Sequence, residues 1–245
     1  NWMYSSDPVP GLDGRVIYHP RGKVLGGSGS INALVYHRGQ AGDYDDWAAA
    51  GNDGWSYADV APHFEQLETP PQDDPGAPHL SVTDNSADFH PMGSDFLEIC
   101  RQGQLPVCDA PAREGTGITP YLTTTRDGQR CSSAKAFLRP AMRRRNLTVV
   151  TGAHVSRIGF EGTRARSVSY SRNGQDFKVR AGAEIILAAG AVGSPQILQL
   201  SGVGDARYLQ SIGIRSVHNA PHVGRHLKDH YGINYIFKSC LLYTS

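Results

Sequence analysis

The sequence EIILAAGAVGSPQILQLSGVG, residues 184–204, decides the expected fold class of this chain of 245 residues. Its first part, residues 184–189, is apolar almost throughout, which is typical of a strand that is covered on both faces. Residues 190–193 predict a glycine turn, after which Ser194 is expected to cap a helix and Pro195 to occupy the first helical position. A strand, a glycine turn and a helix in this order predict an α/β fold.

β-Branched residues dominate the sequence before this unit. They occur in four short runs, residues 147–151, 155–161, 165–171 and 175–180. The pair Asn173-Gly174 separates the last two runs and predicts a tight hairpin, because both residues tolerate a positive φ. We therefore expect a meander of short antiparallel strands that leads into the buried strand.

The first half of the chain predicts helices rather than strands. Residues 56–68 begin with a capping serine and carry apolar side chains at helical spacing. Ser94 is expected to cap a second helix, and residues 132–138 to form a third helix that Pro140 interrupts. Residues 69–91 are rich in Pro, Asp and Ser without periodicity, and they predict a surface excursion.

A second glycine cluster lies in GKVLGGSGSINALVYHRGQAGDYD, residues 22–45. Glycine lets the backbone adopt a positive φ and bring N–H groups close to an anion, while hydroxyl and amide groups add further donors. The cluster contains Gly26, Gly27, Ser28, Gly29, Ser30 and Asn32. This composition predicts a loop that contacts a phosphorylated or flat ligand.

Two other interpretations of this loop fail on the spacing of its residues. A dinucleotide fingerprint, G-x-G-x-x-G, would need a third glycine where Gly27-x-Gly29 leads to Asn32. A nucleophile elbow, G-x-S-x-G, would need glycine two residues after Ser28, but Ser30 stands there. Neither a Rossmann fingerprint nor a serine hydrolase is therefore predicted.

Composition excludes several classes of partner. The formal net charge is +1, which gives no general reason to expect nucleic acid or an acidic membrane surface as a partner. No apolar run has the length of roughly 20 residues that a membrane span needs, so we expect no membrane span. With 39% hydrophobic residues the chain can build a core.

The cysteines and histidines do not predict a disulfide framework or a metal site. No C-x-x-C spacing occurs, so we expect reduced thiols and a cytoplasmic location; the four cysteines are Cys100, Cys108, Cys131 and Cys240. The sequence HLKDH, residues 226–230, imitates a zinc pattern, but Asp replaces the Glu and the surrounding residues disfavour a long helix. We predict no bound metal.

The two glycine segments together resemble the two signatures of the glucose-methanol-choline (GMC) flavoprotein oxidoreductases. The first signature is matched by Gly22-Lys23, Leu25-Gly26-Gly27-Ser28, Ile31-Asn32, Tyr36, Gly39 and Asp45, and the second by residues 190–204. Residues 131–135 and 146–149 resemble the stretches between them. The similarity extends from Trp2 to about Phe237, in particular to choline-dehydrogenase-like members of the family.

The resemblance implies the FAD-binding domain of the glutathione-reductase type together with part of a substrate domain. Residues 1–68 would form an FAD-binding region, 69–145 an excursion with helices on the substrate-domain side, and 146–238 the meander and the strand, turn and helix. Residues 239–245 depart from the family pattern, and we expect a cloning or sequencing junction there.

The resemblance also implies a flavin site. The loop would pass the diphosphate and the ribityl chain, the residues after it would line the isoalloxazine ring, and one backbone position of the meander would meet the adenine. The residues at the diphosphate and the ribityl chain would be Val24, Gly26, Gly27 and Ser28. Those at the isoalloxazine ring would be Asn32, Ala33, Leu34 and Val35, and the one at the adenine would be Val155.

The implied activity is hydride transfer from a primary alcohol, such as a choline-like substrate, to N5 of FAD, while a histidine takes the hydroxyl proton. The acceptor of the electrons, oxygen, quinone or another compound, is not predicted. The family's phosphate loop and its histidine base have no counterpart in this chain, so no residue here is predicted to be catalytic and the chain alone is expected to be inactive. A non-redox lyase on the same scaffold and a non-catalytic fragment stay open as alternatives.

Overall fold

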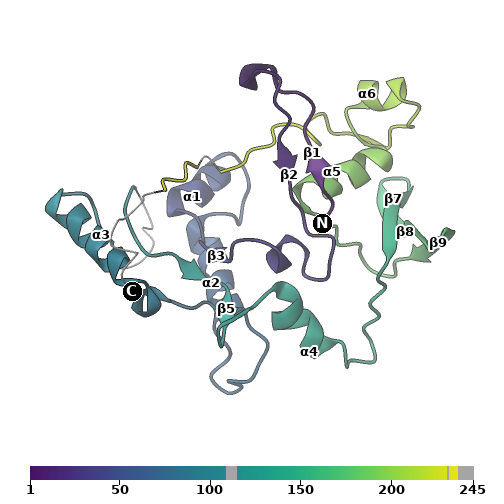
Figure 1. Cartoon of the computed structure of the whole chain (residues 1–245). Helices are drawn as coiled ribbons and strands as arrows, with labels where there is room; N and C mark the ends of the chain where they lie inside the picture. The colour runs from purple at the N-terminus through teal and green to yellow at the C-terminus, as the bar shows by residue number, and fades with distance from the viewer. Residues whose placement is uncertain (109–114, 231, 237–245) are drawn as a thin grey trace. The chain divides into compact units, whose positions relative to one another are not determined.

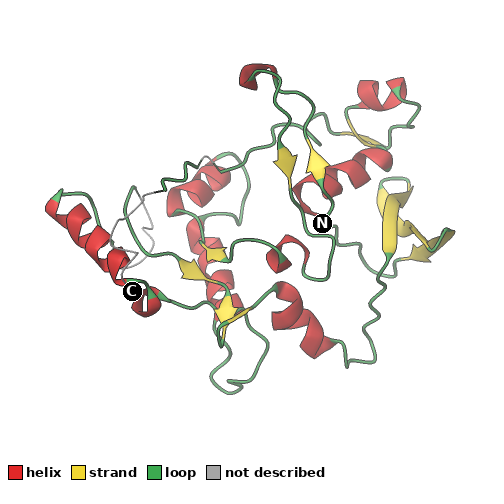
Figure 2. Ribbon diagram, viewed as in Figure 1, coloured by secondary structure: helices red, strands yellow, loops and turns green. Residues whose placement is uncertain are grey.

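The computed structural model describes residues 1–108, 115–230 and 232–236 (Figure 1). The chain divides into two compact units. Unit 1 is Asn1–Val149 and unit 2 is Val150–Ser245. Cys240 and the predicted junction at residues 239–245 lie outside the described residues. Both units mix helices with strands (Figure 2).

Unit 1 consists of short strand pairs and separate helices. Its antiparallel pairs are β1–β2, β3–β4 and β5–β6. The elements are β1 (Tyr4–Ser5), β2 (Tyr18–His19), β3 (Val35–Tyr36), α1 (Ala41–Ala49), α2 (Tyr57–Glu68), α3 (Pro91–Gln102), β4 (Leu122–Thr123), β5 (Thr125–Arg126), β6 (Gln129–Arg130) and α4 (Arg139–Ala141), with 3₁₀ helices at Pro10–Leu12, Gly27–Ser30 and Ser86–Asp88 and a π-helix at Ala134–Leu138.

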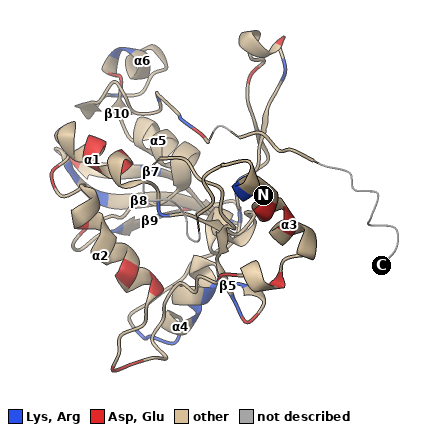
Figure 3. Ribbon diagram, turned by 90° about the vertical axis from the view of Figure 1, so that its left-hand side faces the viewer, with Lys and Arg blue, Asp and Glu red and all other residues tan. Residues whose placement is uncertain are grey.

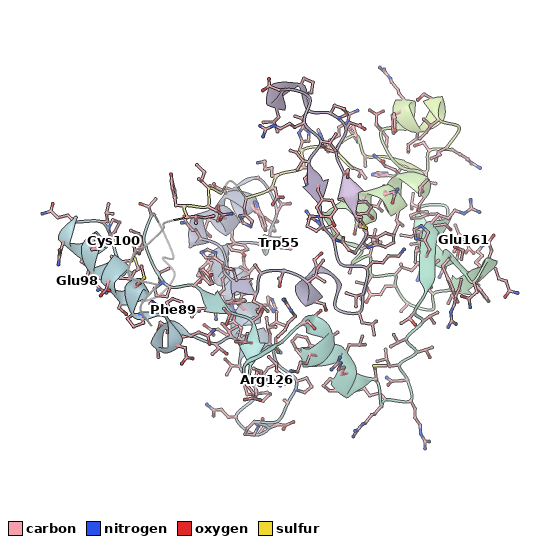
Figure 4. The ribbon with its side chains drawn as sticks, viewed as in Figure 1. Trp55, Phe89, Glu98, Cys100, Arg126 and Glu161 are labelled. Atoms are coloured by element: carbon pink, nitrogen blue, oxygen red, sulfur yellow. The ribbon has the colours of Figure 1, made fainter. Side chains whose placement is uncertain are left out.

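The predicted helix over residues 56–68 is confirmed as α2. Ser56 caps it, because its hydroxyl oxygen accepts from the N–H of Asp59 at 3.3 Å and the Asp59 carboxylate accepts from the N–H of Ser56 at 3.1 Å. Aromatic side chains join α2 to α1: the ring of Tyr44 in α1 meets that of Phe64 in α2 edge to face at 6.1 Å. Trp47 of α1 also meets Trp55, which lies just before α2 and is labelled in Figure 4, edge to face at 5.7 Å.

Two predicted helix boundaries in unit 1 are wrong. The helix expected to begin at Ser94 is α3, which begins at Pro91 because proline presets the helical φ and the ring of His90 accepts from the N–H of Met92. Pro140 does not interrupt the third helix. The π-helix continues into α4, where Pro140 lies in the first turn and needs no N–H partner.

Unit 2 is built on a three-stranded antiparallel sheet in the order β7-β8-β9. The strands β7 (Ala153–Glu161), β8 (Arg164–Arg172) and β9 (Gln175–Arg180) confirm the predicted meander. Asn173 and Gly174 form the hairpin turn with φ of 50° and 75°, as expected. Residues 147–151 form no strand, because no described strand pairs with them, and that prediction is wrong.

The segment that predicted the fold class differs from expectation in detail. Residues 184–189 form no strand, since no described neighbour supplies ladder bonds, and the side chain of Ile186 is 81% exposed. Gly190 reverses the chain with φ of 82°, so α5 (Gly190–Leu200) begins at once and the predicted turn is its first turn. Ser194 and Pro195 therefore lie inside the helix rather than at its start.

The buried residues of unit 2 join the sheet to α5 and α6 (Ala206–Ser211). Ile158, Ile197 and Leu209 are buried, and the buried hydroxyl of Ser201 accepts from the N–H of Ile158 at 2.8 Å. After α5 in the chain, β10 (Val203–Gly204) pairs in parallel with β11 (His218–Asn219). Within the described ranges, no helix combines the length and the apolar character that crossing a membrane requires.

Candidate functional site

The first glycine segment forms a closed loop in unit 1. Gly26 and Gly27 have φ of 88° and 57°, in the left-handed region that favours glycine. The N–H of Gly27 donates to the carbonyl of Val24 at 2.9 Å, and a 3₁₀ turn, Gly27–Ser30, follows. The positive φ expected at the glycine cluster is therefore present at Gly26 and Gly27.

Three glycines of the loop have different steric surroundings. A Cβ on Gly22 would lie 2.2 Å from the carbonyl oxygen of Gly27, and a Cβ on Gly26 would lie 2.4 Å from the hydroxyl oxygen of Ser30. A Cβ on Gly27 would meet no described atom within 4 Å. Gly22 and Gly26 thus allow the loop to close on itself, whereas Gly27 leaves its backbone open on the outer side.

The two hydroxyls of the loop serve the loop itself. The hydroxyl oxygen of Ser28 accepts from the N–H of Gly22 at 3.1 Å. The hydroxyl of Ser30 donates to the carbonyl of Leu25 at 2.8 Å. The proton of Ser30, expected to be a donor to a ligand, is instead used to close the turn.

An arginine from a distant segment holds the end of the loop. Arg130, at the end of β6, donates from Nη1 to the side-chain oxygen of Asn32 at 2.7 Å and to the carbonyl of Gly29 at 3.2 Å. Its Nη2 donates to the carbonyl of Asn32 at 2.8 Å. Two nitrogens of one planar guanidinium thus fix three oxygens, an arrangement that the ammonium of lysine cannot reproduce.

Leu34, two residues beyond Asn32, has a strained backbone. Its φ is 69°, an unusual value for a bulky residue. The side-chain oxygen of Asn32 accepts from the N–H of Leu34 at 3.1 Å, and the carbonyl of Leu34 accepts from the N–H of Thr124 at 2.9 Å. Asn32 therefore links Arg130 to the strained residue, and its amide oxygen is occupied on the protein side.

Aliphatic side chains within and just after the loop are exposed. Val24 and Val35 are 54% and 48% exposed, and Leu25 and Ile31 are exposed as well. Exposed aliphatic side chains next to a polar glycine turn match a ligand that has both a flat ring and a phosphate group. The open side of Gly27 would permit the close backbone approach that such a ligand needs.

A half-buried polar cluster anchors the strand that leaves the loop. Tyr36 donates its hydroxyl to the carboxylate of Glu68 at the end of α2, and Arg38 donates from Nε to the same carboxylate at 2.9 Å. Burial and the neighbouring Glu68 raise the pKa of the Tyr36 hydroxyl above its usual value of about 10, so it stays neutral. The cluster joins β3 to α2 and contributes rigidity rather than proton transfer.

Eight of the nine predicted cofactor residues lie within one stretch of the sequence, residues 24–35, which belongs to unit 1. Val155 lies in β7 of unit 2, half-buried and paired with Tyr170. Its predicted contact with adenine stays a prediction. Arg130 was not among the predicted residues, because the spacing of residues within the loop carries no sign of a contact 98 residues away.

Two histidines at and just before the sequence HLKDH contact each other. Nδ1 of His222 lies 3.3 Å from Nε2 of His226, with the rings tilted at 43°. Within residues 1–108, 115–230 and 232–236, no three metal-ligating side chains are grouped so that they could hold an ion.

Comparison with known proteins gives a consistent result. The family model of the GMC oxidoreductases matches residues 5–232. Human mitochondrial choline dehydrogenase is 42% identical over 247 residues, which cover 98% of this chain and 41% of that protein. An uncharacterised GMC-type oxidoreductase of Mycobacterium tuberculosis is 42% identical over 241 residues, 94% of this chain and 45% of its own length.

A solved structure supports the same assignment. Pyridoxine 4-oxidase from Mesorbium loti superimposes with a TM-score of 0.80 at 32% identity, covering 90% of this chain and 44% of that one. The predicted α/β fold and the predicted cofactor, FAD, are confirmed by these findings. The chain spans less than half the length of the relatives that it matches, and it belongs to the GMC oxidoreductase family.

Proposed function

We propose that the protein to which this chain belongs oxidises the CH–OH group of a primary alcohol, with choline-like alcohols as the first candidates. Bound FAD would accept the hydride at N5. The observation that carries the proposal is the loop of residues 22–35, closed by Gly22 and held by Arg130 beside an exposed aliphatic surface. The similarity to choline dehydrogenase supports the choice of substrate class.

The residues of this chain would bind and orient the flavin. The backbone at Gly27 would lie against the diphosphate, and Val24 and Val35 would cover apolar parts of the cofactor. Asn32 would present its amide N–H₂ to the flavin, because its oxygen is bound by Arg130 and by the N–H of Leu34. Proton removal from the alcohol is assigned to a histidine outside this chain, and the location is proposed to be cytoplasmic.

The test is anaerobic mixing of the FAD-loaded protein, at the full length of its relatives, with choline and with a panel of other primary and secondary alcohols. We expect primary alcohols to bleach the visible absorbance of oxidised flavin. Choline deuterated on its hydroxyl-bearing carbon should react several-fold more slowly. If dithionite reduces the bound FAD but no alcohol does, the proposed activity is wrong, and a non-redox reaction on the same scaffold is favoured.

A further inference from the structure

A cavity in unit 2 is lined only by residues of that unit. It has a volume of about 780 Å³ and lies between one face of the β7-β8-β9 sheet, the end of α5 and the segment that follows α6. Its polar side chains come from all three parts: Arg157, Thr163, Ser169, Lys178, Ser201, Arg215 and Ser216. None of the residues that line it is acidic.

Strand register places two of the cations in one row. Arg157 of β7 is paired with Ser169 of β8, and Ser169 is paired with Lys178 of β9. Side chains of paired residues lie on the same face of a sheet, and adjacent strands are about 4.8 Å apart. The Arg157 and Lys178 backbones are therefore roughly 10 Å apart, with a hydroxyl between them. Arg215 lines the cavity from outside the sheet.

These cations differ from their neighbours in having no carboxylate partner. Arg180 and Arg166 both pair with Glu161 at the end of β7, at 2.9 Å and 3.4 Å; Figure 4 labels Glu161, and Figure 3 marks the Lys and Arg residues in blue. Within the described residues, no Asp or Glu oxygen lies within 4.0 Å of the charged nitrogens of Arg157, Lys178 or Arg215. These three cations are therefore not held in ion pairs with the carboxylates of the described residues.

We infer that this cavity binds the phosphate group of a small anionic ligand. Like charges in a concave surface concentrate the positive potential and attract an anion. Guanidinium groups offer paired N–H donors that match phosphate oxygens, and the hydroxyl of Ser169 supplies a further donor at the centre of the row. The inference does not depend on the proposed alcohol oxidation, since it uses no residue of the loop of residues 22–35.

The test is titration of the 245-residue chain with inorganic pyrophosphate at low ionic strength, followed by calorimetry and by ³¹P line broadening. We expect saturable binding that weakens with added salt. Arg157→Met and Lys178→Met should each weaken it about tenfold or more, the usual effect of losing a charged hydrogen bond. Arg215→Gln changes a residue outside the sheet, so it tests the cavity even if the strand variants fold poorly.

Arg180→Met is the matched control, because Arg180 lies on the same face of β9 but does not line the cavity and is paired with Glu161. It should change the affinity less than twofold. Absence of saturable binding, or equal weakening by Arg180→Met and Lys178→Met, would overturn the inference. Displacement of pyrophosphate by FAD would also overturn it, because the cavity would then be part of the flavin site.

Discussion

The two glycine-rich segments of this chain, residues 22–30 and 190–193, have similar composition but different structures. In the first, Gly26 and Gly27 adopt positive φ, Gly22 allows a close backbone contact, and Arg130 fixes the outgoing end. In the second, only Gly190 has a positive φ, and the following residues form the first turn of α5. Glycine frees the backbone in both places, and the long-range contacts determine which conformation it takes.

The largest expected effect is that of Gly22→Ala. The backbone of Gly22 does not have a positive φ, so its conformation would tolerate alanine. The new Cβ, however, would lie 2.2 Å from the carbonyl oxygen of Gly27, and the backbone at one of these two residues would have to move. We expect the free energy of unfolding to fall by about 2 kcal/mol and FAD binding to be lost. Urea unfolding and a flavin-fluorescence titration measure both effects.

Gly29→Ala is the control for this change, because a Cβ there meets no described atom within 4 Å and φ is not positive. Stability should be unchanged or raised by about 0.4–1 kcal/mol. Equal stability of the two variants would show that the contact between Gly22 and Gly27 does not hold the loop.

The second largest effect is expected for Arg130→Met. This change removes three hydrogen bonds to the loop and keeps an aliphatic side chain at position 130. We expect FAD affinity to fall tenfold or more, because the loop would then have to be ordered by the cofactor itself. Arg126→Met is the matched control: Arg126, which Figure 4 labels, lies on the partner strand β5 and donates to the carbonyl of His79 at 2.8 Å instead of to the loop. If both variants bind FAD equally well, Arg130 has no role in the cofactor site.

Gly27→Ala should separate cofactor binding from stability. The left-handed conformation would disfavour alanine by roughly 1–2 kcal/mol, and no described atom opposes the added methyl group. A cofactor that approaches this backbone would add a second penalty, so FAD affinity should fall by more than the change in apoprotein stability accounts for. Equal changes in the two quantities would place the cofactor elsewhere.

The smallest expected effect belongs to the second glycine segment. The hydroxyl oxygen of Ser194 accepts from the N–H of Ala189 at 3.0 Å, at the start of α5. Ser194→Ala should lower the free energy of unfolding by about 1 kcal/mol and leave FAD affinity unchanged. Asn32→Ala, measured in parallel, should lower FAD affinity, and a larger loss of FAD binding in the Ser194 variant would reverse the comparison.

Local signals in the sequence predicted local structure well. The cap at Ser56 and the hairpin at Asn173-Gly174 each depend on a few adjacent residues, and both are present. Features that depend on distant groups could not be derived in this way. The apolar run of residues 184–189 forms a strand only where neighbouring strands supply hydrogen bonds, and the fork from Arg130 requires a contact between segments 98 residues apart.

In the candidate site, too, local signals in the sequence predict the position of the loop but not its folded geometry. Its loop was identified from glycine spacing and from resemblance to the GMC signatures, but the strained φ of Leu34 and the different surroundings of Gly22, Gly26 and Gly27 are properties of the folded backbone. Ser94 and Ser194 have side chains that suit a helix cap, but Pro91 and Gly190 begin the two helices earlier, so neither serine stands at a helix start.

The distance in sequence between Arg130 and Asn32 also affects the kinetics of folding. A contact across 98 residues requires closure of a long chain segment, so the loop should become ordered only after β5 and β6 have paired. Amide hydrogens of residues 26–34 and of the β5–β6 hairpin should then exchange with solvent in one cooperative opening. Because this ordering is complete before the cofactor arrives, flavin association should be a single concentration-dependent step without a slow rearrangement.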